Sequence, residues 1–220
     1  MTDKLEDLLR SGAEAQSITL TDEQIKLLLN YLQLLHKWNK AYNLTAIREP
    51  EQMLSLHLLD SLSIIPFVSG ENIIDVGTGP GFPGIPLAIF YPKRKFTLMD
   101  SNGKKTRFLF QVKNELGLSN VTEIQSRVEA YQPTRQFDAI TSRAFTSLSD
   151  MVDKTSHLLK NNGRFYAMKG QYPHEELRDL PKHYNVVASH PLQVPGVNGE
   201  RHLVEIEISN NVIELNSHLG

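Results

Sequence analysis

The sequence predicts an α/β protein: a helical segment followed by a mostly parallel sheet of seven strands, of which the last is antiparallel. From residue 72 onward, short apolar runs typical of strands alternate with amphipathic stretches typical of helices. This alternation indicates parallel strands joined by crossover helices. The last two apolar runs are joined by a loop rich in proline and glycine, with no helix between them, which indicates an antiparallel pair.

Two or three helices are expected before the first strand. Apolar residues recur at helical intervals over residues 21–40, and Thr21 and Gln24 have the spacing of a capping box at the start of this helix. A second helix is expected to begin near Pro50, a residue suited to a first helical turn, and to end before Pro66.

The strands and helices of the remaining chain follow from the same periodicities. Gly117 and Gly163 are expected to end the two longer helices. Strands are expected at residues 72–76, 95–99, 121–125, 137–141, 164–168, 184–189 and 202–208, and helices at residues 83–90, 102–116 and 147–160. Loops that follow the parallel strands then open at one edge of the sheet, where α/β proteins bind their ligands.

Length and composition narrow the class of protein. A chain of 220 residues fits one substantial domain with a small appendage, so we expect a helical segment at 1–66 packed on a core at 67–209, and a frayed tail at 210–220. The absence of cysteine excludes disulfides, a thiolate metal site and a cysteine nucleophile, and no metal is expected. The charged start and the lack of any run of roughly 20 apolar residues predict a cytoplasmic protein without membrane contact.

The formal net charge is −2, which argues against coating nucleic acid through bulk electrostatics but is compatible with a local basic patch. Candidates for contacts with nucleic-acid phosphates lie near the carboxyl edge of the sheet. Lys104 and Lys105 open a helix there, and Arg127 and Lys169 lie on loops. The alternative is that Lys104 and Lys105 lie on a solvent-exposed helix face and bind no nucleic acid.

The most informative stretch runs from Ile73 to Gly84, where an apolar strand passes through a glycine-rich turn into a helix. Glycine lets the backbone approach a ligand closely, and the helix directs its free N–H groups at the turn, as in nucleotide sites. The G-x-G-x-x-G string of dinucleotide-binding proteins is present but starts several residues beyond the strand. Pro80 and Pro83 also remove N–H donors that a pyrophosphate needs. A ligand with less phosphate suits this turn better.

Two carboxylates at strand ends favour a cationic nucleoside ligand. Asp75 would repel a pyrophosphate and attract a cation. S-adenosylmethionine carries a sulfonium and an ammonium group and no phosphate. Asp100 ends the next strand, where a carboxylate can accept hydrogen bonds from both hydroxyls of a ribose. The alternative is that both acids only cap the helices that follow.

The loops after the third and fourth strands are expected beside the first two. Backbone groups of Val128 and Glu129 are placed to hydrogen-bond an adenine edge, with Phe82 or Val128 as apolar cover. Arg143 follows the fourth strand, where the reacting centre is expected.

Two further groups of residues are interpreted as structural. The aromatic and basic stripe around Trp38 is typical of a stacking surface but is interpreted as packing. His57 and Asp60 lie at helical spacing, and a hydrogen bond between helices is favoured over a metal or acid–base pair because no third ligand is present.

Several motifs together resemble one enzyme family. The turn after the first strand looks like motif I of the class I S-adenosylmethionine-dependent methyltransferases, in a proline-rich form. Over residues 20–208 the chain resembles the bacterial small-subunit ribosomal RNA guanine-N7 methyltransferases, also called glucose-inhibited division protein B. The motifs are LHKWNKAYNLT at 35–45, HLLDS at 57–61, DVGTGPGFPGIPL at 75–87, QSRVE at 125–129, SRAF at 142–145, YAMKGQ at 166–171 and GERHL at 199–203.

The resemblance implies a Rossmann-like methyltransferase that transfers the methyl group of S-adenosylmethionine to N7 of guanine 527 in 16S rRNA, within the small ribosomal subunit or its precursor. It implies cofactor contacts at Gly77, Phe82, Val128, Glu129 and Arg143. We add Asp75, Gly79 and Asp100 to the expected cofactor-binding residues. A monomer is expected, since no feature demands a dimer.

The chemistry that the resemblance implies fits the residues. N7 of guanine has an available lone pair, so the reaction needs alignment of N7, methyl and sulfur but no general base. Arg143 is the candidate catalytic residue and is able to contact guanine O6, a phosphate or the cofactor carboxylate. Two other functions stay open: a nicotinamide-dependent oxidoreductase that uses residues 79–84, and a non-catalytic RNA-binding module in ribosome assembly.

Overall fold

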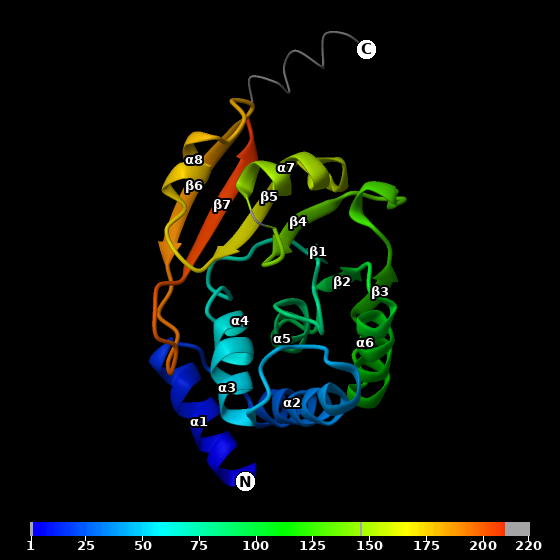
Figure 1. The fold of residues 1–220 in the computed structure, drawn as a ribbon, viewed down its shortest axis with the longest axis vertical. Coiled ribbons are helices and arrows are strands. Elements are labelled where there is room, and N and C mark those ends of the chain that lie inside the picture. Colours follow the sequence, from blue (N-terminus) through cyan, green and yellow to red (C-terminus); the bar gives the residue numbers. More distant parts are fainter. Residues whose placement is uncertain (1, 146, 210–220) are drawn as a thin grey trace.

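The computed structural model describes residues 2–145 and 147–209, so the tail expected at 210–220 lies outside the described residues. Its centre is a seven-stranded sheet with the strand order β3-β2-β1-β4-β5-β7-β6 (Figure 1). The strands are β1 (Asn72–Val76), β2 (Lys95–Asp100), β3 (Val121–Gln125), β4 (Phe137–Ser142), β5 (Leu159–Lys169), β6 (Tyr184–Pro191) and β7 (His202–Ile208).

The pairing of the strands confirms the predicted mixed sheet. The pairs β1–β2, β1–β4, β2–β3 and β4–β5 are parallel. Strand β7 runs antiparallel to both of its neighbours, β5 and β6. Because β1 to β4 are parallel, the loops that follow them open at one edge of the sheet and can share one site.

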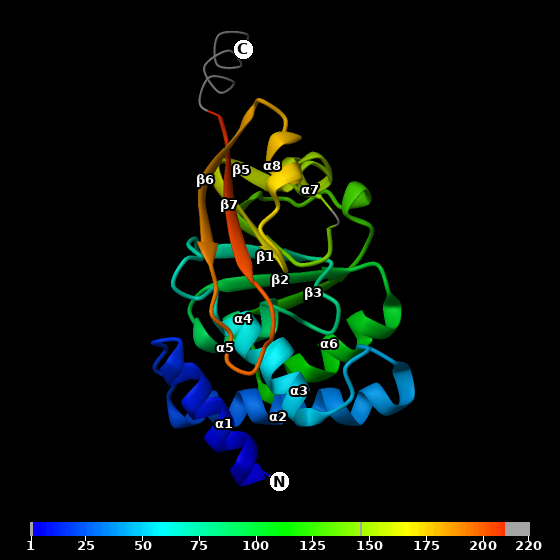
Figure 2. The same ribbon diagram turned by 60° about the vertical axis from the view of Figure 1, so that its left-hand side comes forward.

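Helices cover the two faces of the sheet unequally (Figures 1 and 2). One face carries α1 (Thr2–Ala15), α2 (Asp22–Tyr42), α3 (Pro50–Met53), α4 (Asp60–Leu62), α5 (Gly84–Phe90) and α6 (Gly103–Leu116). The other carries α7 (Leu148–Thr155) and α8 (His174–Arg178). Each face of the sheet has its own hydrophobic core, and successive residues of a strand point to opposite faces. Ile73 packs into the core beneath α1 to α6, and Ile74 packs into the core beneath α7. Within residues 2–145 and 147–209, no helix combines the length and the apolar character that a membrane span requires.

Helix α2 confirms the expected start. Its N-cap Thr21 accepts a hydrogen bond from the Gln24 amide at 3.2 Å, and the Gln24 side chain accepts one from the Thr21 amide at 2.9 Å. Trp38 of this helix packs against Phe108 of α6, with ring centroids 5.6 Å apart, which supports the packing interpretation.

The expected helix at 147–160 is too long. Helix α7 ends at Thr155, a single 3₁₀ turn (Ser156–Leu158) follows, and β5 already begins at Leu159. Gly163 lies inside this strand and does not end a helix. A Cβ at Gly163 would come within 2.9 Å of the Asp138 carbonyl oxygen, so glycine is required there for close strand packing. The short helix α8 was not predicted.

The helix expected from Pro50 contains a π-helical segment in its middle. Residues Leu54–Leu59 form a π-helical segment between α3 and α4. Such segments are rare and often occur at functional sites. His57 and Asp60, from this segment and the residue after it, both line a surface cavity.

The N-terminal helices support the glycine-rich turn directly. Tyr31 of α2 is fully buried, and its hydroxyl donates a hydrogen bond to the Pro80 carbonyl oxygen at 2.8 Å. Its ring lies 5.2 Å from that of Phe82 in the same turn. Burial raises the pKa of Tyr31 well above its ordinary value, so the hydroxyl keeps its proton and acts as the donor.

We predict that Tyr31→Phe lowers the free energy of unfolding by about 1–3 kcal/mol, because the buried Pro80 carbonyl loses its donor. Urea unfolding measures the change. Tyr42→Phe is the matched control: Tyr42 lies on the same helix, is 40% exposed and makes no hydrogen bond through its hydroxyl within the described structure. Equal stability of the two variants would contradict the proposed support of the turn.

Candidate active site

The carboxyl ends of β1, β2, β3 and β4 surround a cavity of about 340 Å³. It collects four residues that the sequence predicted for a cofactor, Gly77, Asp100, Val128 and Glu129, although they come from three separate strand ends. Its lining consists of Val76, Gly77, Met99, Asp100, Ser101, Lys105, Ser126, Arg127, Val128, Glu129, Ala144 and Phe145. We call it the strand-end cavity. Its volume lies within the usual range for small-molecule sites.

Asp100 lies in this cavity and joins two of its loops. Its Oδ2 accepts a hydrogen bond from the Gly79 amide at 2.9 Å, and its Oδ1 accepts one from the Asn102 amide at 2.8 Å. The Lys105 ammonium lies 3.5 Å from Oδ2. Asn102, and not Asp100, is the N-cap of α6. Since a carboxylate has about four acceptor positions, Asp100 retains capacity for ligand hydroxyls.

Asp75 has a different environment from the one expected. Its side chain is fully buried, and its Oδ2 accepts hydrogen bonds from the Thr78 hydroxyl at 2.6 Å and the Gly84 amide at 2.8 Å. Burial raises the pKa of this carboxyl from 3.8 to about 6, against the opposing effect of these donors. Asp75 does not line the strand-end cavity, so its contact with a cationic ligand stays a prediction. Its hydrogen bonds to Thr78 and Gly84 stabilise the glycine-rich turn.

The glycine-rich turn satisfies its own backbone donors. The amides of Gly77 and Thr78 donate to the Met99 carbonyl, and those of Gly81 and Phe82 donate to the Thr78 carbonyl. The Gly79 and Gly84 amides donate to the two aspartates, and Pro80 and Pro83 have no N–H. The turn therefore forms a closed wall and offers no row of free amides to a pyrophosphate.

Gly77 allows the loops after β1 and β4 to meet. Its φ is +68°, and a Cβ placed on it would lie 2.4 Å from the Cβ of Ala144. The Ser142 hydroxyl donates to the Val76 carbonyl at 2.7 Å and accepts from the Ala144 amide at 3.1 Å. These contacts fix the loop that carries Arg143.

Phe82 and Arg143, both expected at the cofactor, do not line the strand-end cavity. Phe82 is 1% exposed, and its ring stacks on His57 with centroids 4.5 Å apart. The Arg143 guanidinium lies 5.3 Å above the Phe82 ring, and its Nη1 donates to Asp60 Oδ2 at 3.0 Å. Their direct contacts with a cofactor stay predictions.

A second cavity, of about 360 Å³, lies on the Arg143 side of this loop. We call it the arginine cavity, after Arg143 and Arg201 in its lining. His57 and Asp60 also line it, but they do not bond each other: His57 Nε2 lies 2.9 Å from the Thr45 hydroxyl, and Asp60 binds the two arginines. Burial and the nearby Arg143 charge lower the pKa of His57 to about 4, so it is neutral at pH 7.

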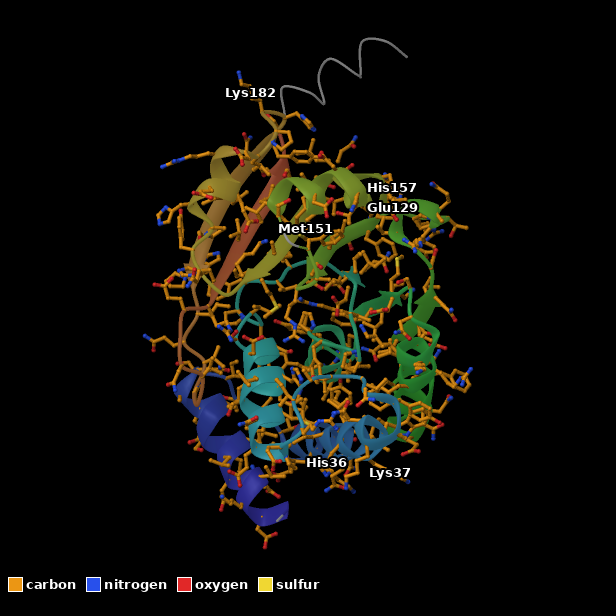
Figure 3. All side chains as sticks on the ribbon, viewed as in Figure 1. His36, Lys37, Glu129, Met151, His157 and Lys182 are labelled. Atoms are coloured by element: carbon orange, nitrogen blue, oxygen red, sulfur yellow. The ribbon has the colours of Figure 1, made fainter. Side chains whose placement is uncertain are left out.

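The basic residues expected to bind RNA differ in availability. Lys104 and Arg127 are exposed near the strand-end cavity, whereas Lys105 is paired with Asp100. The Lys169 side chain is only 11% exposed and its ammonium lies 2.7 Å from Glu176 Oε2. Lys37, on the basic and aromatic stripe of α2, lies far from the strand-end cavity: Figure 3 shows it well separated from Glu129, which lines the cavity.

Sequence reasoning missed the roles of Arg201 and Glu176. The hydrogen bond between helices that it favoured for His57 and Asp60 is wrong, because the partners of both residues lie in loops. Arg201 was present in the GERHL motif, but a motif does not reveal a contact across 141 positions. Within the described residues, no group of three or more His, Asp or Glu side chains is placed to hold a metal ion.

The architecture is that of a class I methyltransferase. The glycopeptide N-methyltransferase MtfA, solved in complex with S-adenosyl-L-methionine, superposes with a TM-score of 0.59 and 10% identity over 69% of this chain and 87% of its own. At this identity the likeness establishes the fold.

Sequence comparisons identify the family. The model of the family described as rRNA small subunit methyltransferase G matches residues 24–204. The protein named ribosomal RNA small subunit methyltransferase G from Marinomonas sp. (strain MWYL1) is 57% identical over 90% of this chain and 95% of its own length. Its namesake from Saccharophagus degradans is 56% identical over 91% and 90%. The chain belongs to the rRNA small subunit methyltransferase G family.

We predict that Gly77→Ala costs more stability than Gly117→Ala. Both glycines have nearly equal φ angles, +68° and +66°, so both substitutions carry the penalty of roughly 1–2 kcal/mol for a left-handed alanine. Only at Gly77 does the new methyl group meet Ala144, which adds about 1–3 kcal/mol of overpacking. Denaturant unfolding measures the difference, and Ala144→Gly in the Gly77→Ala background is expected to recover part of it. Equal losses at the two positions would contradict the contact.

We predict that Asp75 makes stability fall as pH rises from about 4 to about 6. The folded carboxyl binds a proton more tightly than the unfolded one, so its contribution is present below pH 4 and is lost as pH passes about 6. The loss amounts to at most about 3 kcal/mol. Unfolding of wild type and Asp75→Asn at several pH values tests this, since the isosteric amide keeps an acceptor for Thr78 and Gly84 but does not titrate. A constant difference between the two proteins from pH 4 to 7 would refute it.

Proposed function

We propose that this protein transfers the methyl group of S-adenosyl-L-methionine to N7 of guanine 527 in 16S rRNA. The observation that carries the proposal is family membership over residues 24–204, with relatives named for methylation of small-subunit ribosomal RNA. The strand-end cavity supports it, because four of the eight residues expected for the cofactor line this cavity: Gly77, Asp100, Val128 and Glu129.

The strand-end cavity suits a nucleoside without phosphate. Asp100 lines it at the end of β2, where we expect it to accept the ribose hydroxyls, and we expect Val128 and Glu129 of the 3₁₀ turn after β3 to contact the adenine. The closed amide bonding of the glycine-rich turn argues against a pyrophosphate. This disfavours the alternative of a nicotinamide-dependent oxidoreductase.

The chemistry requires alignment of the reactants. The lone pair of guanine N7 attacks the methyl carbon, the carbon–sulfur bond breaks, and its electron pair returns to sulfur. The products are a cationic methylated guanine and S-adenosylhomocysteine, and no proton is removed from N7. The lowered pKa of His57, about 4, makes it a weak base, which is consistent with a reaction that needs alignment and no general base.

The RNA is expected to approach across the strand-end loops. Lys104 and Arg127 are exposed there and can contact phosphates. Lys105 and Lys169 are engaged with Asp100 and Glu176, so their contact with RNA requires exchange of partners. We propose that the substrate is the small ribosomal subunit or its precursor and that the enzyme acts as a cytoplasmic monomer.

The direct test is incubation of the protein with tritium-labelled S-adenosyl-L-methionine and small ribosomal subunits from a strain that lacks the activity. We expect label in 16S rRNA. Borohydride and aniline, which cleave RNA at N7-methylguanine, are expected to cut at position 527. Cofactor binding without any transfer would instead support a non-catalytic assembly module.

We predict that Asp100→Ala weakens the binding of S-adenosyl-L-methionine by about 1–3 kcal/mol, or roughly 5- to 150-fold, because charge-assisted hydrogen bonds to the ribose are lost. Isothermal titration calorimetry measures the dissociation constant. Glu123→Gln is the control, since Glu123 lies on the adjacent strand, pairs with Lys113 and does not line the strand-end cavity. An unchanged dissociation constant for Asp100→Ala would remove Asp100 from the site.

A further inference from the structure

The arginine cavity has the composition of a site for a single polar ring. It shares no lining residue with the strand-end cavity, but the loop after β4 contributes to both: Arg143 lines one, while Ala144 and Phe145 line the other. Apolar cover comes from Leu56, Met168 and Leu192. The charged groups in the lining are the guanidinium groups of Arg143 and Arg201, the Asp60 carboxylate, and the Lys169 ammonium, which is paired with Glu176. Apolar cover combined with a few convergent polar groups is typical of pockets that receive a flipped base.

Asp60 holds both guanidinium groups of the arginine cavity. Its side chain is 6% exposed, its Oδ2 accepts from Arg143 Nη1 at 3.0 Å, and its Oδ1 accepts from Arg201 Nε at 3.2 Å. Each carboxylate oxygen therefore serves one arginine. The three residues come from α4, from the loop after β4 and from the turn before β7, so a single side chain links three remote segments.

We propose that the arginine cavity receives the acceptor guanine and that Asp60 is its positioning residue; the inference rests on the proposed function. The N7 and O6 edge of guanine carries only acceptors, and arginine is its commonest partner. Each guanidinium has five N–H donors, so Arg143 and Arg201 retain donors beyond those that Asp60 accepts. A donor on O6 orients the ring and leaves N7 free to attack the methyl group, which it must reach directly, past the edge of this loop.

Asp60 also adjusts the charge of the arginine cavity. The reaction places a positive charge on the guanine ring, which two adjacent guanidinium groups would disfavour. A buried carboxylate between them offsets one of the two charges. Asparagine in its place keeps one acceptor oxygen and presents an N–H₂ group to the other arginine, so it can hold only one guanidinium.

The test compares Asp60→Asn with wild type and with Glu205→Gln. Glu205 lies in the same sheet and accepts from Arg164 Nε at 3.1 Å, but it lines neither cavity. We expect the dissociation constant of S-adenosyl-L-methionine to change less than twofold in Asp60→Asn. We expect kcat/KM for small ribosomal subunits to fall at least tenfold, with a lower kcat, and Glu205→Gln to retain wild-type kinetics.

A second variant, Arg201→Gln, keeps the test decisive if Asp60→Asn does not fold. It removes the Arg201 guanidinium from the arginine cavity and keeps Asp60. We again expect an almost unchanged dissociation constant for S-adenosyl-L-methionine and a lower kcat/KM for methyl transfer. The inference is overturned if the folded variants retain kcat/KM within twofold of wild type, or if cofactor affinity falls as much as kcat/KM does. A wild-type protein that transfers no methyl group overturns the proposed function and this inference together.

Discussion

The close contact between Gly77 and Ala144 is the constraint on which the site depends. It brings the loops after β1 and β4 within van der Waals distance, where any side chain at position 77 would collide. The hydroxyl of Ser142, bonded to Val76, holds the two loops in this position. The resulting partition separates the strand-end cavity from the arginine cavity. Cavities on the two sides of one loop bring a cofactor and an acceptor base close together, and transfer requires that the methyl group and N7 meet directly past this loop, because the reacting atoms must be in line.

The rigidity of the glycine-rich turn distinguishes this site from a dinucleotide site. Its amides are occupied by neighbouring carbonyls and by Asp75 and Asp100, and Tyr31 supports it from α2. A dinucleotide site instead directs free amides at a pyrophosphate. The N-terminal helices therefore belong to the functional unit: their side chains share a hydrophobic core with the sheet, and they hold the wall of the cavity in place.

The sequence predicted the sheet and the strand-end cavity well because both follow from local patterns. Strand periodicity located the carboxyl ends of β1 to β4, and parallel strands bring such ends to one edge, so Asp100 and Val128 were found together. The π-helical segment at Leu54–Leu59 and the role of Gly163 were not predictable, since both depend on packing against distant segments. The pairing of Asp60 with two arginines, 83 and 141 positions away, is likewise a tertiary contact that no local spacing encodes.

The most direct test of the two-compartment account is a crystal structure of the protein with S-adenosylhomocysteine. The account predicts the nucleoside in the strand-end cavity, its ribose hydroxyls within hydrogen-bond distance of Asp100, and its sulfur facing the loop that carries Arg143 and Ala144. The turn is predicted to keep its internal hydrogen bonds. A nucleoside bound in the arginine cavity, or a turn that opens its amides toward the ligand, would contradict the account.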